Sequence, residues 1–200
     1  MNDGAEVGRL RKALAGPMPA SSDFDLNPGV QLDPGRVLRP AAVLIGLLPG
    51  PAGMELVLTK RSSRLRHHPG QIALPGGKID AGDGSPEAAA LREAEEEVGL
   101  DRRTVDLLGQ LPPHETVTGY RITPVVGVIR APFAPVPEAG EVDEVFRVPF
   151  AHVADPGRYR VERRQWLGAW RNYYAVPWGP YYIWGATARI LRGLAERVQA

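Results

Sequence analysis

The chain has 200 residues, of which 44% are hydrophobic and 24% charged, and its formal net charge at pH 7 is +1. This length and composition are sufficient for one globular domain with its own core. The small net charge excludes a general attraction to nucleic acids or membrane surfaces, and the absence of cysteine excludes disulfides, a thiol nucleophile and a zinc–thiolate site.

No segment of the sequence has the character of a membrane anchor or a secretory signal. The longest apolar run, residues 41–48, is far shorter than the roughly 20 residues that span a bilayer. The first residues lack the apolar stretch of a signal peptide. We therefore expect a cytoplasmic protein, and the lack of cysteine agrees with a reducing compartment.

The pattern along the chain predicts an N-terminal arm followed by one domain. Residues 1–38 are expected to form the arm, with a short helix over 5–15 and a loop rich in Pro, Gly and Asp over 21–38. The domain is expected over residues 39–200. Apolar runs predict strands at 41–48 and 54–61 around a turn at 49–53, and further strands at 72–74, 104–111, 121–129 and 144–150.

The last part of the chain completes the predicted fold. A short helix is expected at 151–155, a hairpin from 158–167 and 171–178, and an amphipathic closing helix at 181–198. This order of strands and helices indicates an α+β fold, with a mixed β-sheet flanked by helices.

Residues 86–98 carry the clearest helix signals in the chain. Ser85 is a favourable N-cap and Pro86 suits the first helical position. Gly99 stands where helices commonly end in a left-handed residue. The Ala and Leu residues between them favour helix by their intrinsic propensity.

The segment REAEEE, residues 92–97, places four glutamates on this helix. Spacings of three and four residues put Glu93, Glu96 and Glu97 on one face, whereas Glu95 points elsewhere. Three carboxylates on one face repel one another, and a hard divalent cation such as Mg²⁺ or Mn²⁺ would relieve the repulsion. Arg92 can pair with a carboxylate and hold it in place. The alternative is an acidic face that only meets solvent, as charge runs commonly do.

Two adjacent glycines just before this helix favour a binding site over a solvated face. Gly76 and Gly77 lie in the segment LPGGK. Because glycine has no side chain, this backbone can approach a ligand or a metal closely.

Residues 76–100, GGKIDAGDGSPEAAALREAEEEVGL, resemble the Nudix box: a glycine, an acidic position, and then Arg-Glu-aliphatic-x-Glu-Glu-x-Gly-aliphatic. The second half matches closely, from Arg92 to Leu100. Three features depart from the box. Asp83 stands where glutamate is usual, eight residues instead of seven separate it from Arg92, and Ala94 is small for its aliphatic position. All three departures lie outside the three glutamates.

The resemblance implies a Nudix α/β/α sandwich and a hydrolase of a nucleoside diphosphate linked to another group. It implies Glu93 and Glu97 as metal ligands, Glu96 as a third ligand or the general base, and Arg92 as a further catalytic residue, with Mg²⁺ or Mn²⁺ as cofactor. Diphosphate hydrolysis develops negative charge on phosphoryl oxygens, which metal ions neutralise. Which glutamate accepts the proton of the attacking water stays open.

The preceding segment, LTKRSSRLRHHPGQIALPGG at 58–77, resembles the signature of the coenzyme A pyrophosphatase subfamily, L-L-T-x-R-S-x3-R-x3-G-x3-F-P-G-G, with Leu74 in place of its Phe. The resemblance implies coenzyme A or a derivative as the small-molecule substrate, cleaved to 3′,5′-ADP and 4′-phosphopantetheine or its acyl form. The expected substrate-binding residues are Arg61, Arg66, Gly76 and Gly77, because guanidinium groups bind phosphates bidentately. The alternative is that the two arginines only solvate a loop or pair with nearby acidic residues.

Two other functions stay open. One is a Nudix pyrophosphatase for ADP-ribose, dinucleotides or nucleoside triphosphates. The other is a non-catalytic Nudix-fold module that binds a nucleotide, although the three retained glutamates favour an enzyme.

Several residues outside the two motifs carry weaker expectations. Glu141 or Glu144 could add a carboxylate to the metal site, but each is expected to be an exposed acid, and the pair His67-His68 is expected to be incidental. The aromatic residues of the last third, among them Tyr181 and Trp184, are assigned to core packing or to a subunit interface, so a homodimer is considered.

Overall fold

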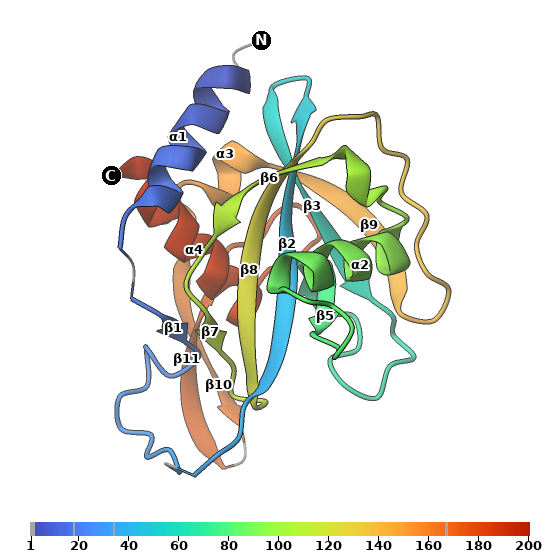
Figure 1. The fold of residues 1–200 in the computed structure, drawn as a ribbon. Helices are drawn as coiled ribbons and strands as arrows, with labels where there is room; N and C mark the ends of the chain where they lie inside the picture. The colour runs from blue at the N-terminus through green and yellow to red at the C-terminus, as the bar shows by residue number, and fades with distance from the viewer. Residues whose placement is uncertain (1–2, 18, 34, 167) are drawn as a thin grey trace.

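The computed structural model describes residues 3–17, 19–33, 35–166 and 168–200. Residues 1, 2, 18 and 34 of the expected arm, and residue 167 of the expected hairpin, lie outside this described part. The centre of the fold is a mixed sheet in which β2 runs parallel to β8 and antiparallel to β3 (Figure 1). The strands of this sheet are β1 (Ser21–Ser22), β2 (Arg39–Gly50), β3 (Gly53–Arg61), β4 (Ile72–Ala73), β5 (Gly76–Lys78), β6 (Val105–Gln110), β7 (His114–Glu115), β8 (Tyr120–Ile129) and β9 (Val142–Pro149).

In the described ranges, four α-helices and a separate hairpin accompany this sheet. The hairpin pairs β10 (Arg160–Trp166) with β11 (Ala169–Ala175) and extends from one end of the molecule (Figure 1). Two single turns of 3₁₀ helix occupy Arg102–Thr104 and Pro156–Arg158. The α-helices are α1 (Asp3–Ala15), α2 (Pro86–Val98), α3 (Phe150–Val153) and α4 (Gly185–Gln199). Within the described residues, no helix has the length and apolar character needed to cross a membrane.

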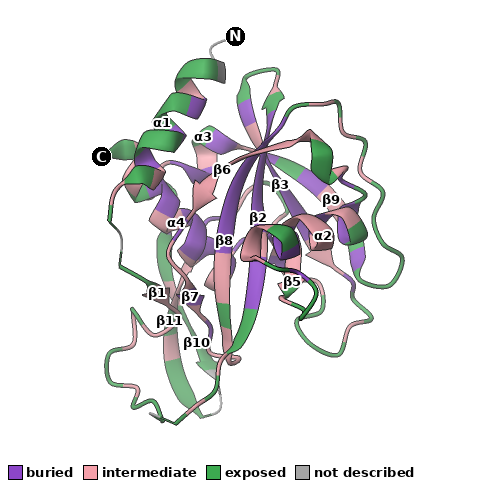
Figure 2. Ribbon diagram, viewed as in Figure 1, coloured by how far each residue is buried: buried purple, intermediate pink, exposed green. Residues whose placement is uncertain are grey.

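The sheet has an apolar core on each face, because side chains alternate along its strands. On one face, Ala90 and Ala94 of α2 pack in a cluster with Leu44 of β2. On the other face, Leu191 of α4 belongs to a cluster with Ile45, the neighbour of Leu44 on β2. Figure 2 shows the buried residues concentrated on these central strands. The predicted α+β fold, a mixed sheet flanked by helices, is confirmed.

Helix α2 begins and ends where its sequence predicts. The side chain of Ser85 accepts a hydrogen bond from the N–H of Ala88 at 3.2 Å. Gly99 has φ 72°, in the left-handed region, and its N–H bonds the last turn of the helix. These two caps fix the register of the glutamates relative to the sheet.

The described residues of the N-terminal arm contribute to the same core as the domain that follows. The predicted short helix is α1, whose Leu10 is fully buried in the cluster that contains Ile45. Beyond it, β1 pairs in parallel with β7. There the fully buried His114 contacts the hydroxyl of Ser21 at 2.9 Å and a carboxylate oxygen of Asp23 at 3.2 Å.

The closing helix is shorter than predicted. The expectation placed its start at residue 181, but α4 begins at Gly185. Tyr181 and Trp178 form an antiparallel bridge, and the N–H of Val176 donates to the carbonyl of Ile183 at 2.8 Å. These backbone bonds to the residues just before hold residues 181–183 outside the helix, which overrides their helical pattern.

Candidate active site

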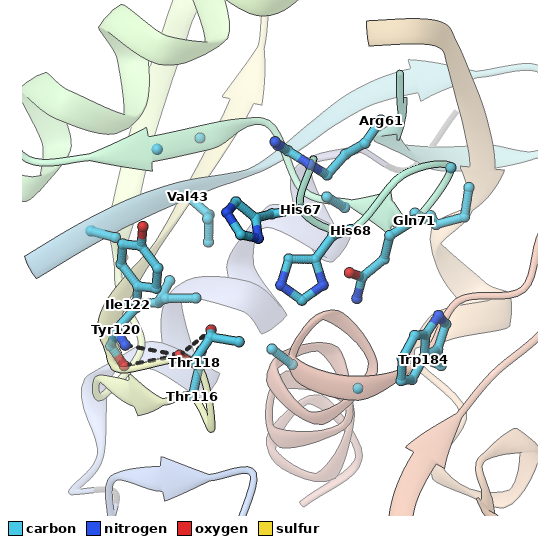
Figure 3. Close-up of a pocket in the computed structure, with 18 of the residues that line it drawn as sticks. Val43, Arg61, His67, His68, Gln71, Thr116, Thr118, Tyr120, Ile122 and Trp184 are labelled. Carbon is cyan, nitrogen blue, oxygen red and sulfur yellow. Dashed lines mark hydrogen bonds between the residues drawn. The ribbon is translucent and has the colours of Figure 1, made fainter. Parts of the chain in front are cut away.

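A cavity of about 1650 Å³ opens beside the first residues of the parallel strands β2 and β8 (Figure 3). This volume exceeds the roughly 300–1,000 Å³ of ordinary small-molecule pockets. Its walls come from β2, β3, β5, α2 and β8, from the loop at residues 62–71, and from the segment between the hairpin and α4. The cavity therefore joins the two motifs found in the sequence to parts of the chain far from both.

Glu97 lies on the face of α2 that meets this cavity, and only 5% of its surface is exposed. One carboxylate oxygen, Oε2, accepts a hydrogen bond from the N–H of Gly76 at 3.0 Å. The other, Oε1, lies 4.0 Å from a guanidinium nitrogen of Arg61. Burial raises the pKa of Glu97 to about 7, although Gly76 and Arg61 favour its charged form. Glu97 is therefore a buried carboxylate whose negative charge Arg61 neutralises only in part.

Glu93 lies one turn earlier on α2 and lines the same cavity. Burial raises its pKa, whereas Arg92, 3.1 Å away, acts in the opposite direction. The carboxylate of Glu93 stands close to the backbone of Gly77, where an added Cβ atom would come within 2.5 Å of it. The negative charge of Glu93 also raises the pKa of Glu97, because two nearby carboxylates repel each other.

Gly76 has the stronger requirement for glycine. Its φ is 153°, and an added Cβ atom would lie 2.6 Å from the Cα of Val43 on β2. The close approach of β5 to β2 brings the Gly76 N–H to Glu97. Only glycine fits this combination of conformation and space.

Arg92 organises the region around the glutamates. It binds Asp83 bidentately, with N···O distances of 2.8 and 2.9 Å, and donates to the carbonyl of Lys78 at 3.2 Å. The bonds from Arg92 lower the pKa of Asp83 to about 2. Asp83 has a shorter side chain than the usual glutamate of the box, and one additional residue separates it from Arg92. It still reaches Arg92 and binds it bidentately.

Glu96 does not join Glu93 and Glu97 on the cavity wall. Its carboxylate accepts a hydrogen bond from Arg92 at 2.9 Å, and 58% of its side chain is exposed. Glu95 pairs with Arg102 on the outside, with Nε···Oε2 at 2.7 Å. Glu95 points away from the other three glutamates, as its spacing predicts. Of those three, only Glu93 and Glu97 line the cavity, whereas Glu96 lies outside it.

Glu93 and Glu97 fit a divalent cation whose remaining ligands come from water and from the phosphates of the substrate. In the described part of the chain, no three His, Cys, Asp or Glu side chains form a ready metal-binding group. Mg²⁺, however, commonly uses one or two carboxylates together with waters and substrate phosphates, not a cage made by protein alone. The buried Glu97 and the partly buried Glu93, with raised pKa values on one wall, would provide such a pair.

The two arginines predicted to bind substrate occupy different positions. Arg61, on β3, lines the cavity (Figure 3). One of its guanidinium nitrogens lies 4.0 Å from Glu97. Arg66 is exposed on the loop after β3 and lies outside the lining. The spacing of the motif therefore brings only one of them into contact with the cavity.

The structure adds residues that the motifs did not indicate. His67 and His68 line the cavity, as do Glu141 and Glu144. Five aromatic side chains from distant parts of the chain also line the cavity: Tyr120, Tyr173, Tyr181, Tyr182 and Trp184. The hydroxyl of Tyr181 donates a hydrogen bond to Oε1 of Glu144 at 2.5 Å. The aromatic richness of the last third was the available signal, but it carried no information about which rings face a cavity.

Comparison with known proteins agrees with this geometry. The model of the NUDIX domain matches residues 37–169. The relatives include "Uncharacterized Nudix hydrolase NudL" of Escherichia coli SMS-3-5, 44% identical over 164 residues, and its namesake in Shigella boydii serotype 18, 43% identical. Each alignment covers 80% of this chain and 83% of the relative.

Solved structures show the same fold. A Nudix hydrolase of M. smegmatis, RenU, matches with TM-score 0.50 and 27% identity, over 61% of this chain and 83% of its own. A MutT/nudix family protein of Enterococcus faecalis matches with TM-score 0.51 and 15% identity, over 86% of this chain and 66% of its own. With Glu93 and Glu97 of the box on one cavity wall and a family match over most of its length, the chain belongs to the Nudix family.

Proposed function

We propose that this protein is a divalent-metal-dependent hydrolase that cleaves the diphosphate of coenzyme A or a derivative, giving 3′,5′-ADP and 4′-phosphopantetheine or its acyl form. The family and the hydrolase names of its relatives support an enzyme that acts on nucleoside diphosphate derivatives. One observation carries the proposal further. Glu93 and Glu97 of the box share a cavity with Arg61 of the upstream motif, and this cavity exceeds the size of ordinary ligand pockets.

The roles of the residues follow from their positions. Glu93 and Glu97 would hold the cation, which when bound would neutralise charge on the diphosphate and lower the pKa of a coordinated water. Gly76 fixes one oxygen of Glu97, so that its other oxygen faces Arg61. Arg61 is then placed to bind a phosphoryl oxygen of the same diphosphate. One water adds across the phosphoanhydride, and each product keeps one of the two phosphates.

Arg92 acts indirectly in this scheme. Its bonds to Asp83, Glu93 and Glu96 tie the loop before α2 to the helix. The loop carries the acidic position of the box, so Arg92 keeps the cavity wall in one arrangement. Glu96, bound to Arg92, remains a proposed third ligand or base only if it turns towards the cavity.

A substrate panel tests the proposal. The protein is incubated with Mg²⁺ and with coenzyme A, ADP-ribose, a dinucleoside polyphosphate or a nucleoside triphosphate, and the products are identified by mass. Coenzyme A should give the highest kcat/KM. Faster cleavage of ADP-ribose or a dinucleotide would instead identify the alternative Nudix pyrophosphatase. Binding without any turnover would identify a nucleotide-binding module.

A further inference from the structure

Arg164 approaches the same cavity from the hairpin, a part of the chain that belongs to neither motif. It lies on β10 and lines the cavity. Its guanidinium stands 4.8 Å from the centroid of the Trp184 ring. Among the described residues, Arg164 makes no ion pair with a carboxylate. A guanidinium stacked on an aromatic ring keeps its N–H donors free at the edge for an anion.

A second group, His68, projects into the middle of this cavity (Figure 3). The loop that carries it is closed by two backbone bonds. The N–H of Arg61 donates to the carbonyl of Gln71 at 2.9 Å, and the N–H of Gly70 donates to the carbonyl of Arg61 at 3.0 Å. His68 has φ 56°, a left-handed conformation that costs a residue other than glycine about 1 kcal/mol. The loop thus maintains a strained residue whose ring faces the cavity, as is common for ligand-binding positions.

The pKa of His68 responds to cationic groups on two parts of the cavity wall. Burial lowers its pKa from the ordinary 6.5, and the charges of Arg61, His67 and Arg164 lower it further. The side chain of Gln71 hydrogen-bonds the ring. Arg61 belongs to the Glu97 side of the cavity and Arg164 to the Trp184 side. His68 and Arg164 therefore add donors to this cavity on the side of Trp184, where the guanidinium of Arg164 supplies positive charge.

The position of this region decides what it can bind. The diphosphate that is cleaved must lie at Glu93 and Glu97, next to Arg61. Arg164 stands beside Trp184, whose ring is a surface on which a nucleobase could stack. An anion at Arg164 would therefore be a separate group of the same ligand, close to its base.

We propose that Arg164 and His68 bind a phosphomonoester that the substrate carries in addition to the cleaved diphosphate, with Trp184 beside it for the nucleobase. The substrate class is thus a nucleoside diphosphate derivative with a further phosphate on its ribose. This inference rests on the proposed function and adds the residues that bind the extra phosphate.

The test compares two nucleotides that differ only in that phosphate. Isothermal titration calorimetry measures the Kd of 3′,5′-ADP and of 5′-AMP for the full-length protein in Mg²⁺ buffer at fixed salt. The wild type should bind 3′,5′-ADP at least tenfold more tightly, because a charge-assisted contact to a phosphate contributes at least that factor. Arg164→Gln should reduce the ratio to threefold or less.

Arg163 offers a matched control on the same strand. Neighbouring side chains of a strand point to opposite faces, and Arg163 stacks over Trp170 at 4.9 Å, outside the cavity lining. Arg163→Gln should therefore keep the wild-type ratio. His68→Asn retains a residue that tolerates the left-handed conformation, and should lower the ratio by a smaller factor than Arg164→Gln.

A wild-type ratio near one, an unchanged ratio in Arg164→Gln, or no binding of either nucleotide at millimolar concentration would overturn the inference. Hydrolysis of coenzyme A is measured separately on the wild type. Discrimination between the nucleotides without that hydrolysis would reject the proposed function alone, whereas hydrolysis without discrimination would reject this inference alone.

Discussion

The backbone N–H of Gly76 donates a hydrogen bond to Oε2 of Glu97 across 3.0 Å, which joins β5 to helix α2. The two residues are 21 positions apart in the chain. This bond links the glycine pair of the sequence to its glutamates. It also orients Glu97, whose other oxygen remains near Arg61.

Gly76→Ala is expected to disrupt this link. The new Cβ atom would meet the backbone of Val43 at 2.6 Å, and alanine would be strained at φ 153°. Overpacking of this kind costs roughly 1–3 kcal/mol before the strain is added. Denaturant unfolding should show the loss of stability, and hydrolysis should fall with it because Glu97 loses its donor.

Gly84→Ala provides the control for Gly76→Ala. Gly84 also has a left-handed φ, 50°, but no atom lies within 4 Å of its added Cβ. Its cost should be only the backbone strain of about 1–2 kcal/mol. Equal losses in the two variants would contradict the role of close packing at Gly76.

Asp83→Asn should reduce kcat while the far-UV circular dichroism stays that of the wild type. The substitution replaces the carboxylate that binds Arg92 bidentately, so Arg92 and the loop before α2 lose their fixed position. We expect at least a tenfold fall in kcat. Asp80→Asn should have a smaller effect, since Asp80 is 71% exposed and 3.7 Å from Arg92. The reverse order of the two variants would contradict this account.

The raised pKa of Glu97 predicts how pH changes the stability of the metal-free protein. The carboxyl has its ordinary pKa of 4.5 in the unfolded chain and about 7 in the folded one, so the folded state binds the proton more tightly. Its contribution to the free energy of unfolding is full below pH 4.5 and is lost as the pH rises through about 7. At pH 8 with EDTA, Glu97→Gln should be more stable than the wild type, by about 3 kcal/mol at most.

Urea unfolding at pH 5 and pH 8 measures this effect. The variant should gain over the wild type at pH 8 and much less at pH 5. Added Mn²⁺ should then stabilise the wild type at pH 8 more than Glu97→Gln, because the cation replaces the proton. If Glu97→Gln is less stable than the wild type in EDTA at pH 8, folding does not disfavour the ionised form of Glu97, and this account is contradicted.

The local part of the fold was predictable from the sequence, because its signals act over a few residues. Helix α2 runs from Pro86 to Val98 as predicted, since Ser85 and Gly99 determine its ends by themselves. The strands at the centre of the sheet follow from their apolar runs. Helix α4 is the exception, because backbone bonds to the residues before it shorten its start.

The site was predictable only where spacing along one element decides it. Helical spacing placed Glu93 and Glu97 together, but it could not show that Arg92 holds Glu96 outside the cavity. Likewise, the loop sequence did not distinguish Arg61, which lines the cavity, from Arg66, which does not. Trp184 reaches the cavity through contacts between distant segments, which no local pattern encodes.

The central claim, a carboxylate-held metal that cleaves coenzyme A, is tested most directly by comparing Glu97→Gln with Glu95→Gln. Both variants remove one carboxylate from α2, but Glu95 pairs with Arg102 on the outer surface. Hydrolysis of coenzyme A in Mg²⁺ is followed by the mass of its products. The account predicts that Glu95→Gln forms 3′,5′-ADP and 4′-phosphopantetheine at the wild-type rate, whereas Glu97→Gln loses at least a hundredfold in kcat with its fold intact. Near-normal turnover by Glu97→Gln, or equal losses in both variants, would contradict it.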